Sequence, residues 1–117
     1  MQARFLELDI EEAFREVLSW PISQIRLGGY WNELEPEPEK FVFDPLLSLL
    51  EEAEAAKKEV VLTVGAKAPR WPEFHFPDFV APDPKLPETH DRICRFVEKL
   101  VQTTRSFSCI TSWQIEN

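Results

Sequence analysis

The sequence predicts an α/β fold in which helices alternate with parallel strands. Three segments place apolar residues at helical spacing, three short runs are apolar and rich in β-branched residues, and the two kinds alternate along the 117 residues. This alternation is typical of parallel βα units joined by right-handed crossovers. Because the length suits one domain, we expect a single domain over residues 1–117.

The first predicted helix covers residues 10–19, with Asp9 as a candidate N-cap. Its apolar stripe contains Ile10, Ala13, Phe14, Val17 and Leu18. Pro21 disfavours helical geometry at Trp20, so the helix is expected to end there.

The second helix is predicted to start at Asp44-Pro45, with Asp44 as N-cap and the proline in the first turn. Its buried stripe is expected to contain Leu46, Leu49, Leu50, Ala53 and Ala56, and Lys57 and Lys58 suit the helix dipole at its end. A third amphipathic helix is marked by Ile93, Phe96, Val97, Leu100 and Val101.

The predicted strands cover residues 23–27, 60–64 and 109–115. The second is uninterruptedly apolar, which is typical of a parallel strand covered on both faces. In such sheets the loops after the strands carry the ligand site. We therefore expect the functional residues in loops 28–40 and 65–87, and after Asn117; the proline-rich and aromatic second loop is predicted to be a packed binding loop.

Composition excludes several classes of protein. A hydrophobic fraction of 44% argues against disorder, and a net charge of −8 argues against nucleic acid or an anionic membrane as a partner. No apolar run approaches the roughly 18 residues of a membrane-spanning helix. With 3 glycines, no glycine-rich phosphate loop can be written. Cys94 and Cys109 are interpreted as buried free thiols, with a disulfide or a metal-binding pair as the alternative.

Three segments resemble successive strand ends of the clan A retaining glycoside hydrolases, such as family 5 cellulases and family 42 β-galactosidases. They are Ile25-Arg26-Leu27-Gly28-Gly29-Tyr30-Trp31-Asn32-Glu33-Leu34-Glu35-Pro36, residues 61–71, and Trp113-Gln114-Ile115-Glu116-Asn117. The resemblance implies a partial (β/α)₈ TIM barrel, with barrel strands 2 to 4 and three helices in this chain. The first strand would precede residue 1, and strands 5 to 8 would follow residue 117.

The family pattern continues W-x-x-x-E-P-x-x-G-x-F-x-F, where this chain has Pro38-Glu39-Lys40-Phe41-Val42-Phe43. The turn glycine is replaced, so we expect strain in this turn. In the family the glutamate acid/base follows the asparagine matched by Asn117. The resemblance therefore implies hydrolysis of β-linked sugars with retention by the parent enzyme, without metal or organic cofactor. It also implies that this chain lacks both catalytic carboxylates and is inactive alone.

The resemblance assigns supporting roles to several residues. Arg26 would hold the nucleophile ionised, although it could instead pair with an acidic helix residue, and Asn117 would bind the sugar 2-hydroxyl. Trp31 and Trp71 would stack on sugar rings, and the hydroxyl-binding candidates are Asn32, Glu33, Lys67 and His75. For the aromatic residues, packing inside the protein is the alternative.

Glu33 and Glu35 could form a carboxylate pair, but residues two apart in a loop are seldom both aimed at one substrate, so they are interpreted as solvated loop acids rather than a catalytic pair. Glu116 is not assigned as the catalytic acid. A different class of function stays open. Three parallel strands with exposed edges would suit a non-catalytic module that self-associates or is completed by a partner.

Overall fold

The computed structural model describes residues 7–67 and 73–115. Its elements, in chain order, are α2 (Ile10–Ser19), β1 (Gln24–Tyr30), α3 (Trp31–Leu34), α4 (Asp44–Ala55), β2 (Glu59–Gly65), α5 (Pro87–Thr104) and β3 (Ile110–Ile115). The predicted α/β alternation is confirmed. The short helix α3 was not predicted, because its four residues lie in a segment that the sequence marks only as a loop.

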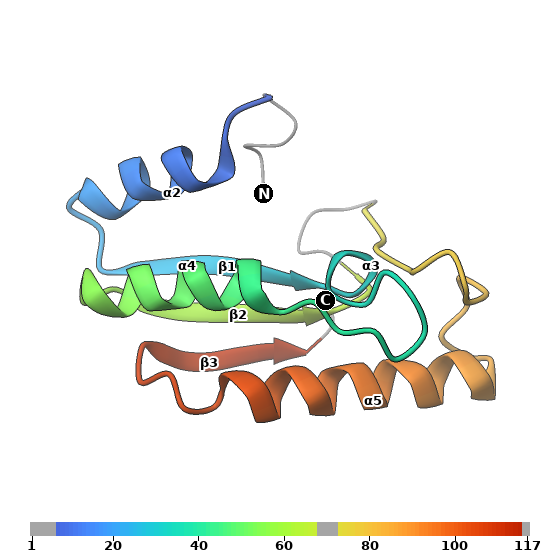
Figure 1. Ribbon diagram of the computed structural model, residues 1–117. Coiled ribbons are helices and arrows are strands. Elements are labelled where there is room, and N and C mark those ends of the chain that lie inside the picture. Colours follow the sequence, from blue (N-terminus) through green and yellow to red (C-terminus); the bar gives the residue numbers. More distant parts are fainter. Residues whose placement is uncertain (1–6, 68–72, 116–117) are drawn as a thin grey trace.

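The three strands form one parallel sheet in the order β1-β2-β3. Helices α4 and α5 pack on β2, whose Val60, Leu62 and Val64 are fully buried. All strands end at the same edge of the sheet, where α3 and the two long loops gather (Figure 1). This common edge positions the candidate site.

The opposite face of the sheet is covered only in part by the residues that the structure describes, since Thr63 is buried there whereas other positions are exposed. Arg26 and Ser112 occupy neighbouring register positions on that face, on either side of Val61, and both are exposed. The described helices cover one face of β2, while on its other face Val61 is half-buried and Thr63 is buried.

Local signals explain most helix boundaries. Asp9 caps α2 by accepting a hydrogen bond of 2.9 Å from the Glu12 backbone N–H, as predicted. Asp44 is the first residue of α4 rather than its N-cap, which is Phe43. Lys58 donates to the Trp20 and Ile22 carbonyls at 2.9 and 2.6 Å, so it joins the start of β2 to the start of β1.

Glu54 ties α4 to the start of β3. Its Oε1 accepts from the Ser108 hydroxyl at 2.6 Å and from the backbone N–H groups of Ser108 and Cys109. The Ser108 hydroxyl is the main cause that lowers the pKa of Glu54, and the backbone donors add to it. Burial, and then the Glu54 charge, raise the pKa of the Cys109 thiol.

The two cysteines are both free, but only one is buried. Cys109 is buried as predicted, whereas Cys94 is exposed on α5. The prediction for Cys94 was wrong because the residue lies outside the apolar stripe of its helix.

Candidate functional site

Two loops meet at the carboxyl edge of the sheet. The backbone N–H of Asn32, just after β1, donates to the His75 carbonyl at 3.0 Å, and the His75 N–H donates to the Ala66 carbonyl just after β2. These bonds place the β1 loop against the β2 loop. Two groups of residues that the sequence predicted separately, Asn32 with Glu33 and Lys67 with His75, therefore share one region.

A ring pair forms one wall of this region. The rings of Tyr30 and His75 stack with centroids 4.1 Å apart and planes inclined by 13°. The Tyr30 ring folds back over Gly28, since a Cβ placed on Gly28 would lie 2.3 Å from the Tyr30 Cζ. Only glycine leaves room for the tyrosine in this position.

A cavity of about 670 Å³ opens beside the ring pair. Its polar lining comes from the strand end, the two loops and Glu11 of α2, and its apolar lining comes from the helices. The lining residues are Ile10, Glu11, Gly28, Tyr30, Asn32, Glu33, Leu34, Pro45, Leu46, Leu49, Glu73 and His75. An apolar pocket with a few polar groups is the usual form of a site for a small ligand.

Trp31 lies inside the protein rather than in this cavity. Its exposed fraction is 0%, and its ring packs with Phe76, Phe79 and Phe96 at centroid distances of 6.0 to 6.5 Å. The prediction that Trp31 offers a ring face to a sugar is wrong for this structure, because the ring is covered by protein.

Glu35 is also buried, with an exposed fraction of 3%. Its Oε2 accepts from the Trp31 indole at 2.6 Å, and its Oε1 accepts from the Glu39 backbone N–H at 2.8 Å. The interpretation of Glu35 as a solvated loop acid is therefore wrong. The carboxylate holds the turn that follows α3.

The same turn contains the position at which the family pattern has a glycine. Glu39 stands at the glycine position of the pattern and has a φ of 62°, a conformation that favours glycine. The predicted strain is thus located at Glu39.

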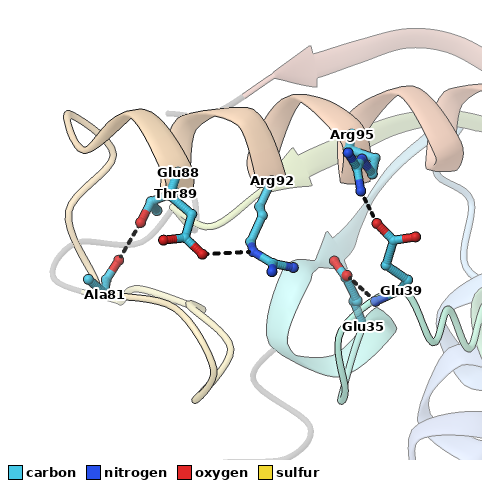
Figure 2. A network of polar contacts seen from close by, with 7 residues as sticks. All are labelled: Glu35, Glu39, Ala81, Glu88, Thr89, Arg92 and Arg95. Carbon is cyan, nitrogen blue, oxygen red and sulfur yellow. Dashed lines mark hydrogen bonds and ion pairs between the residues drawn. The ribbon is translucent and has the colours of Figure 1, made fainter.

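Side chains of helix α5 form polar contacts with both loops (Figure 2). Arg95 pairs with Glu39 of the first loop, and the Thr89 hydroxyl donates to the Ala81 carbonyl of the second loop at 3.1 Å. Arg92 lies 3.7 Å from Glu88 and sits over the Phe79 ring at 5.6 Å. The loops are therefore held by side chains of α5 as well as by each other.

The remaining predicted residues are distributed as follows. Arg26 lies on the partly covered face of β1, and no carboxylate in the described ranges pairs with it. Lys67 forms an isolated antiparallel bridge with Phe74. Trp71, Glu116 and Asn117 lie outside the described residues.

Sequence reasoning missed Glu11, Tyr30 and Glu73 in the cavity lining and Glu35 in the turn. A signal existed for Tyr30, because it follows Gly28 by two positions and strand residues two apart share a face. Glu35 is followed by Pro36 within an acidic stretch, which favoured a solvated loop. Glu73 approaches the cavity only because the second loop folds back toward Ala66.

The carboxylate, amide and imidazole groups that line the cavity can form hydrogen bonds with a ligand, and the apolar residues of its lining can pack against it. Among the described residues, no group of three or more histidine, cysteine, aspartate or glutamate side chains is placed to hold a metal ion. No helix in the described ranges has the length and apolarity needed to cross a bilayer.

The fold is that of part of a (β/α)₈ barrel, and three solved structures similar to it are glycoside hydrolases. The exo-β-1,4-mannosidase Op5Man5 from Opitutaceae bacterium strain TAV5 matches with a TM-score of 0.80 and 15% sequence identity. The cold-adapted β-galactosidase from Rahnella sp. R3 matches with a TM-score of 0.73 and 15% identity, and the β-galactosidase from the psychrophilic Marinomonas ef1 with 0.61 and 16%.

These matches cover 99 to 100% of this chain but only 20 to 22% of the three enzymes. The chain thus spans about a fifth of their length. No protein-family model and no curated protein matches the sequence. Similarity at this level of identity establishes the fold, whereas function depends on the site.

Proposed function

We propose that this chain supplies part of the barrel and one wall of the sugar site of a retaining β-glycoside hydrolase. The main support for the proposal is the backbone hydrogen bond from Asn32 to His75, which brings the loops after β1 and β2 together at the carboxyl edge of a partial barrel. Ligand sites of such barrels are built from the loops at that edge. The strand-end resemblance and the similar fold of a mannosidase and two β-galactosidases support it.

In this proposal the chain contributes supporting groups rather than the catalytic pair. Asn32, Glu33, Lys67 and His75 hydrogen-bond sugar hydroxyls, and Trp71 stacks on a ring. Arg26 orients the nucleophilic carboxylate, and Asn117 binds the 2-hydroxyl, where the hydrogen bond strengthens as positive charge develops on the sugar. In this proposal the two catalytic carboxyl groups, the proton donor and the nucleophile, are not among these residues. We therefore expect no turnover by this chain alone.

The test combines a kinetic assay with a binding titration. Aryl β-mannosides, β-galactosides and β-glucosides should not be hydrolysed by the 117-residue chain at high concentration. Turnover that purifies with the chain and disappears in Glu33→Gln would contradict the proposal, because it would place a catalytic acid in this loop.

In an NMR titration with manno-, galacto- and cello-oligosaccharides, we expect weak binding with shifts at Asn32, Glu33 and His75. His75→Ala should abolish those shifts, whereas His90→Ala, which changes an exposed residue of α5, should preserve them. Shifts elsewhere would contradict the site. Micromolar binding lost on Trp71→Ala would instead indicate a carbohydrate-binding module.

A second candidate function is a non-catalytic module that associates through its sheet edges. The observation that favours it is that β1 and β3 each pair with β2 alone among the described strands. Light scattering and hydrogen exchange test this candidate. A monodisperse monomer with well-protected amides in all three strands would contradict it.

A further inference from the structure

Helix α5 carries a histidine and a cysteine that the proposed sugar site does not use. His90 and Cys94 lie four residues apart, so their side chains are neighbours on one face of the helix. The Cys94 Sγ lies 4.0 Å from Nδ1 and 3.9 Å from Nε2 of the His90 ring. Both residues are exposed, and neither lines the cavity. An imidazole and a free thiol therefore meet at the surface of α5.

The separation of these two groups suits the chelation of one metal ion. A tetrahedral zinc ion bonds thiolate sulfur at about 2.3 Å and imidazole nitrogen at about 2.0–2.1 Å, which places the two ligand atoms about 3.6 Å apart. The observed 3.9 Å between Sγ and Nε2 exceeds this value by about 0.3 Å. Because the His90 side chain is 65% exposed, its ring has room to turn and close this difference.

The neighbouring charges favour a cation at the pair. The Asp91 Oδ1 lies 3.7 Å from the His90 Nδ1, where it favours a proton on Nδ1 and leaves the Nε2 lone pair for a metal. The two arginines of this stretch, Arg92 and Arg95, are each paired with a glutamate. A net charge of −8 also attracts cations to the chain as a whole.

We propose that His90 and Cys94 bind one zinc ion through Nε2 and a deprotonated Sγ, with Asp91 as a positioning residue. Zinc prefers imidazole and thiolate ligands, whereas magnesium and calcium prefer oxygen. The Cys94 thiol releases its proton to solvent when the metal binds. No third histidine, cysteine, aspartate or glutamate joins the pair in the part of the chain that the structure describes, so water completes the coordination.

The bound ion would join residues 90 and 94 across one turn of α5. The preceding residue Thr89 holds the second loop, since its hydroxyl donates to the Ala81 carbonyl at 3.1 Å. Zinc should therefore slow hydrogen exchange in this part of the helix. The inference does not rest on the proposed sugar chemistry.

A zinc titration of the reduced, metal-free 117-residue chain tests the site. We expect one zinc ion per chain with a dissociation constant of roughly 10 µM, since two of the four ligands of a closed site contribute about half of its binding free energy. Cobalt(II), used in place of zinc, should give a thiolate-to-metal charge-transfer band.

Three single variants examine the role of each residue. Cys94→Ser should weaken zinc binding at least about tenfold and remove the cobalt band, because it removes the thiolate ligand. His90→Ala should weaken binding by a similar factor. Asp91→Asn should weaken it about tenfold while keeping the cobalt band, because it changes the group that orients the imidazole but neither ligand.

A relocated thiol provides the matched control. Cys94→Ser combined with Glu98→Cys keeps the number of thiols, but it places the thiol eight residues from His90, about 12 Å along the helix axis. This variant should bind zinc no better than Cys94→Ser alone. Cys109→Ala should bind zinc as the parent chain does, because the Cys109 thiol is buried.

Four results would overturn the inference. They are no cobalt band at millimolar metal, unchanged binding in Cys94→Ser or His90→Ala, binding restored by the relocated thiol, and one metal ion per two chains. The last result would show that the pair is half of a site shared between two copies. A chain that binds zinc but no sugar would leave this inference standing and remove the proposed glycosidase role, so the two failures are distinguishable.

Discussion

The indole Nε1 of Trp31 donates a hydrogen bond of 2.6 Å to Oε2 of Glu35, and both side chains are buried. The two residues lie four positions apart, across the single turn of α3. Because the carboxylate also accepts from the Glu39 backbone, this one pair joins the aromatic core to the turn of the first loop.

We expect Glu35→Ala to destabilise the chain by about 2–4 kcal/mol, because it leaves a buried indole N–H without an acceptor and creates a cavity. Glu37→Ala, an exposed change in the same loop, should stay within about 0.5 kcal/mol. Urea unfolding followed by tryptophan fluorescence measures both. Equal effects of the two variants would refute the role assigned to Glu35.

Replacing Glu39 by glycine should relieve the strain of its φ of 62°. The replacement also removes the exposed ion pair with Arg95, which we expect to contribute less than about 1 kcal/mol. The clean comparison is therefore made in an Arg95→Gln background, where the pair is already absent. There Glu39→Gly should raise the free energy of unfolding by about 1 kcal/mol. A decrease would show that the turn is not strained.

Gly28→Ala should disrupt the ring pair of the cavity wall. The new Cβ would overlap the Tyr30 ring, so the tyrosine must leave His75, at a cost of about 1–3 kcal/mol. In a Tyr30→Ala background the same change should cost much less, which a double-mutant cycle measures. Additive effects, or unchanged NMR shifts of the His75 ring, would contradict the contact.

The hydrogen bonds to Glu54 predict a dependence of stability on pH. Its pKa is lower in the folded chain than the usual carboxyl value of about 4.3, so its stabilising contribution is complete above that value and is lost as the pH falls through the folded pKa. Glu54→Gln should therefore be less stable than the parent at neutral pH, and the difference should shrink below about pH 4. Urea unfolding across this range tests it. Glu51→Gln, an exposed change on the same helix, should show no such trend.

Local patterns in the sequence determined the order and type of the elements. Helix α2 has the predicted bounds and cap because its apolar spacing, Asp9 and Pro21 all act within a few residues. The parallel direction of the strands also followed from the sequence, since each strand is separated from the next by a helix. The sequence pattern also predicted a strained turn, which the structure places at Glu39.

Only the tertiary structure decided which side chains are covered. Trp31 and Glu35 lie in a segment rich in acids and prolines. The Trp31 ring packs with Phe76, Phe79 and Phe96, which are distant in the chain, and Glu35 is buried beside the indole to which it is hydrogen-bonded. The Tyr30–His75 stack likewise depends on the second loop folding back onto the first. Helical and strand periodicities arise from neighbouring residues, whereas burial and ring contacts arise where remote segments meet, so the sequence alone could order the elements but could not place these side chains.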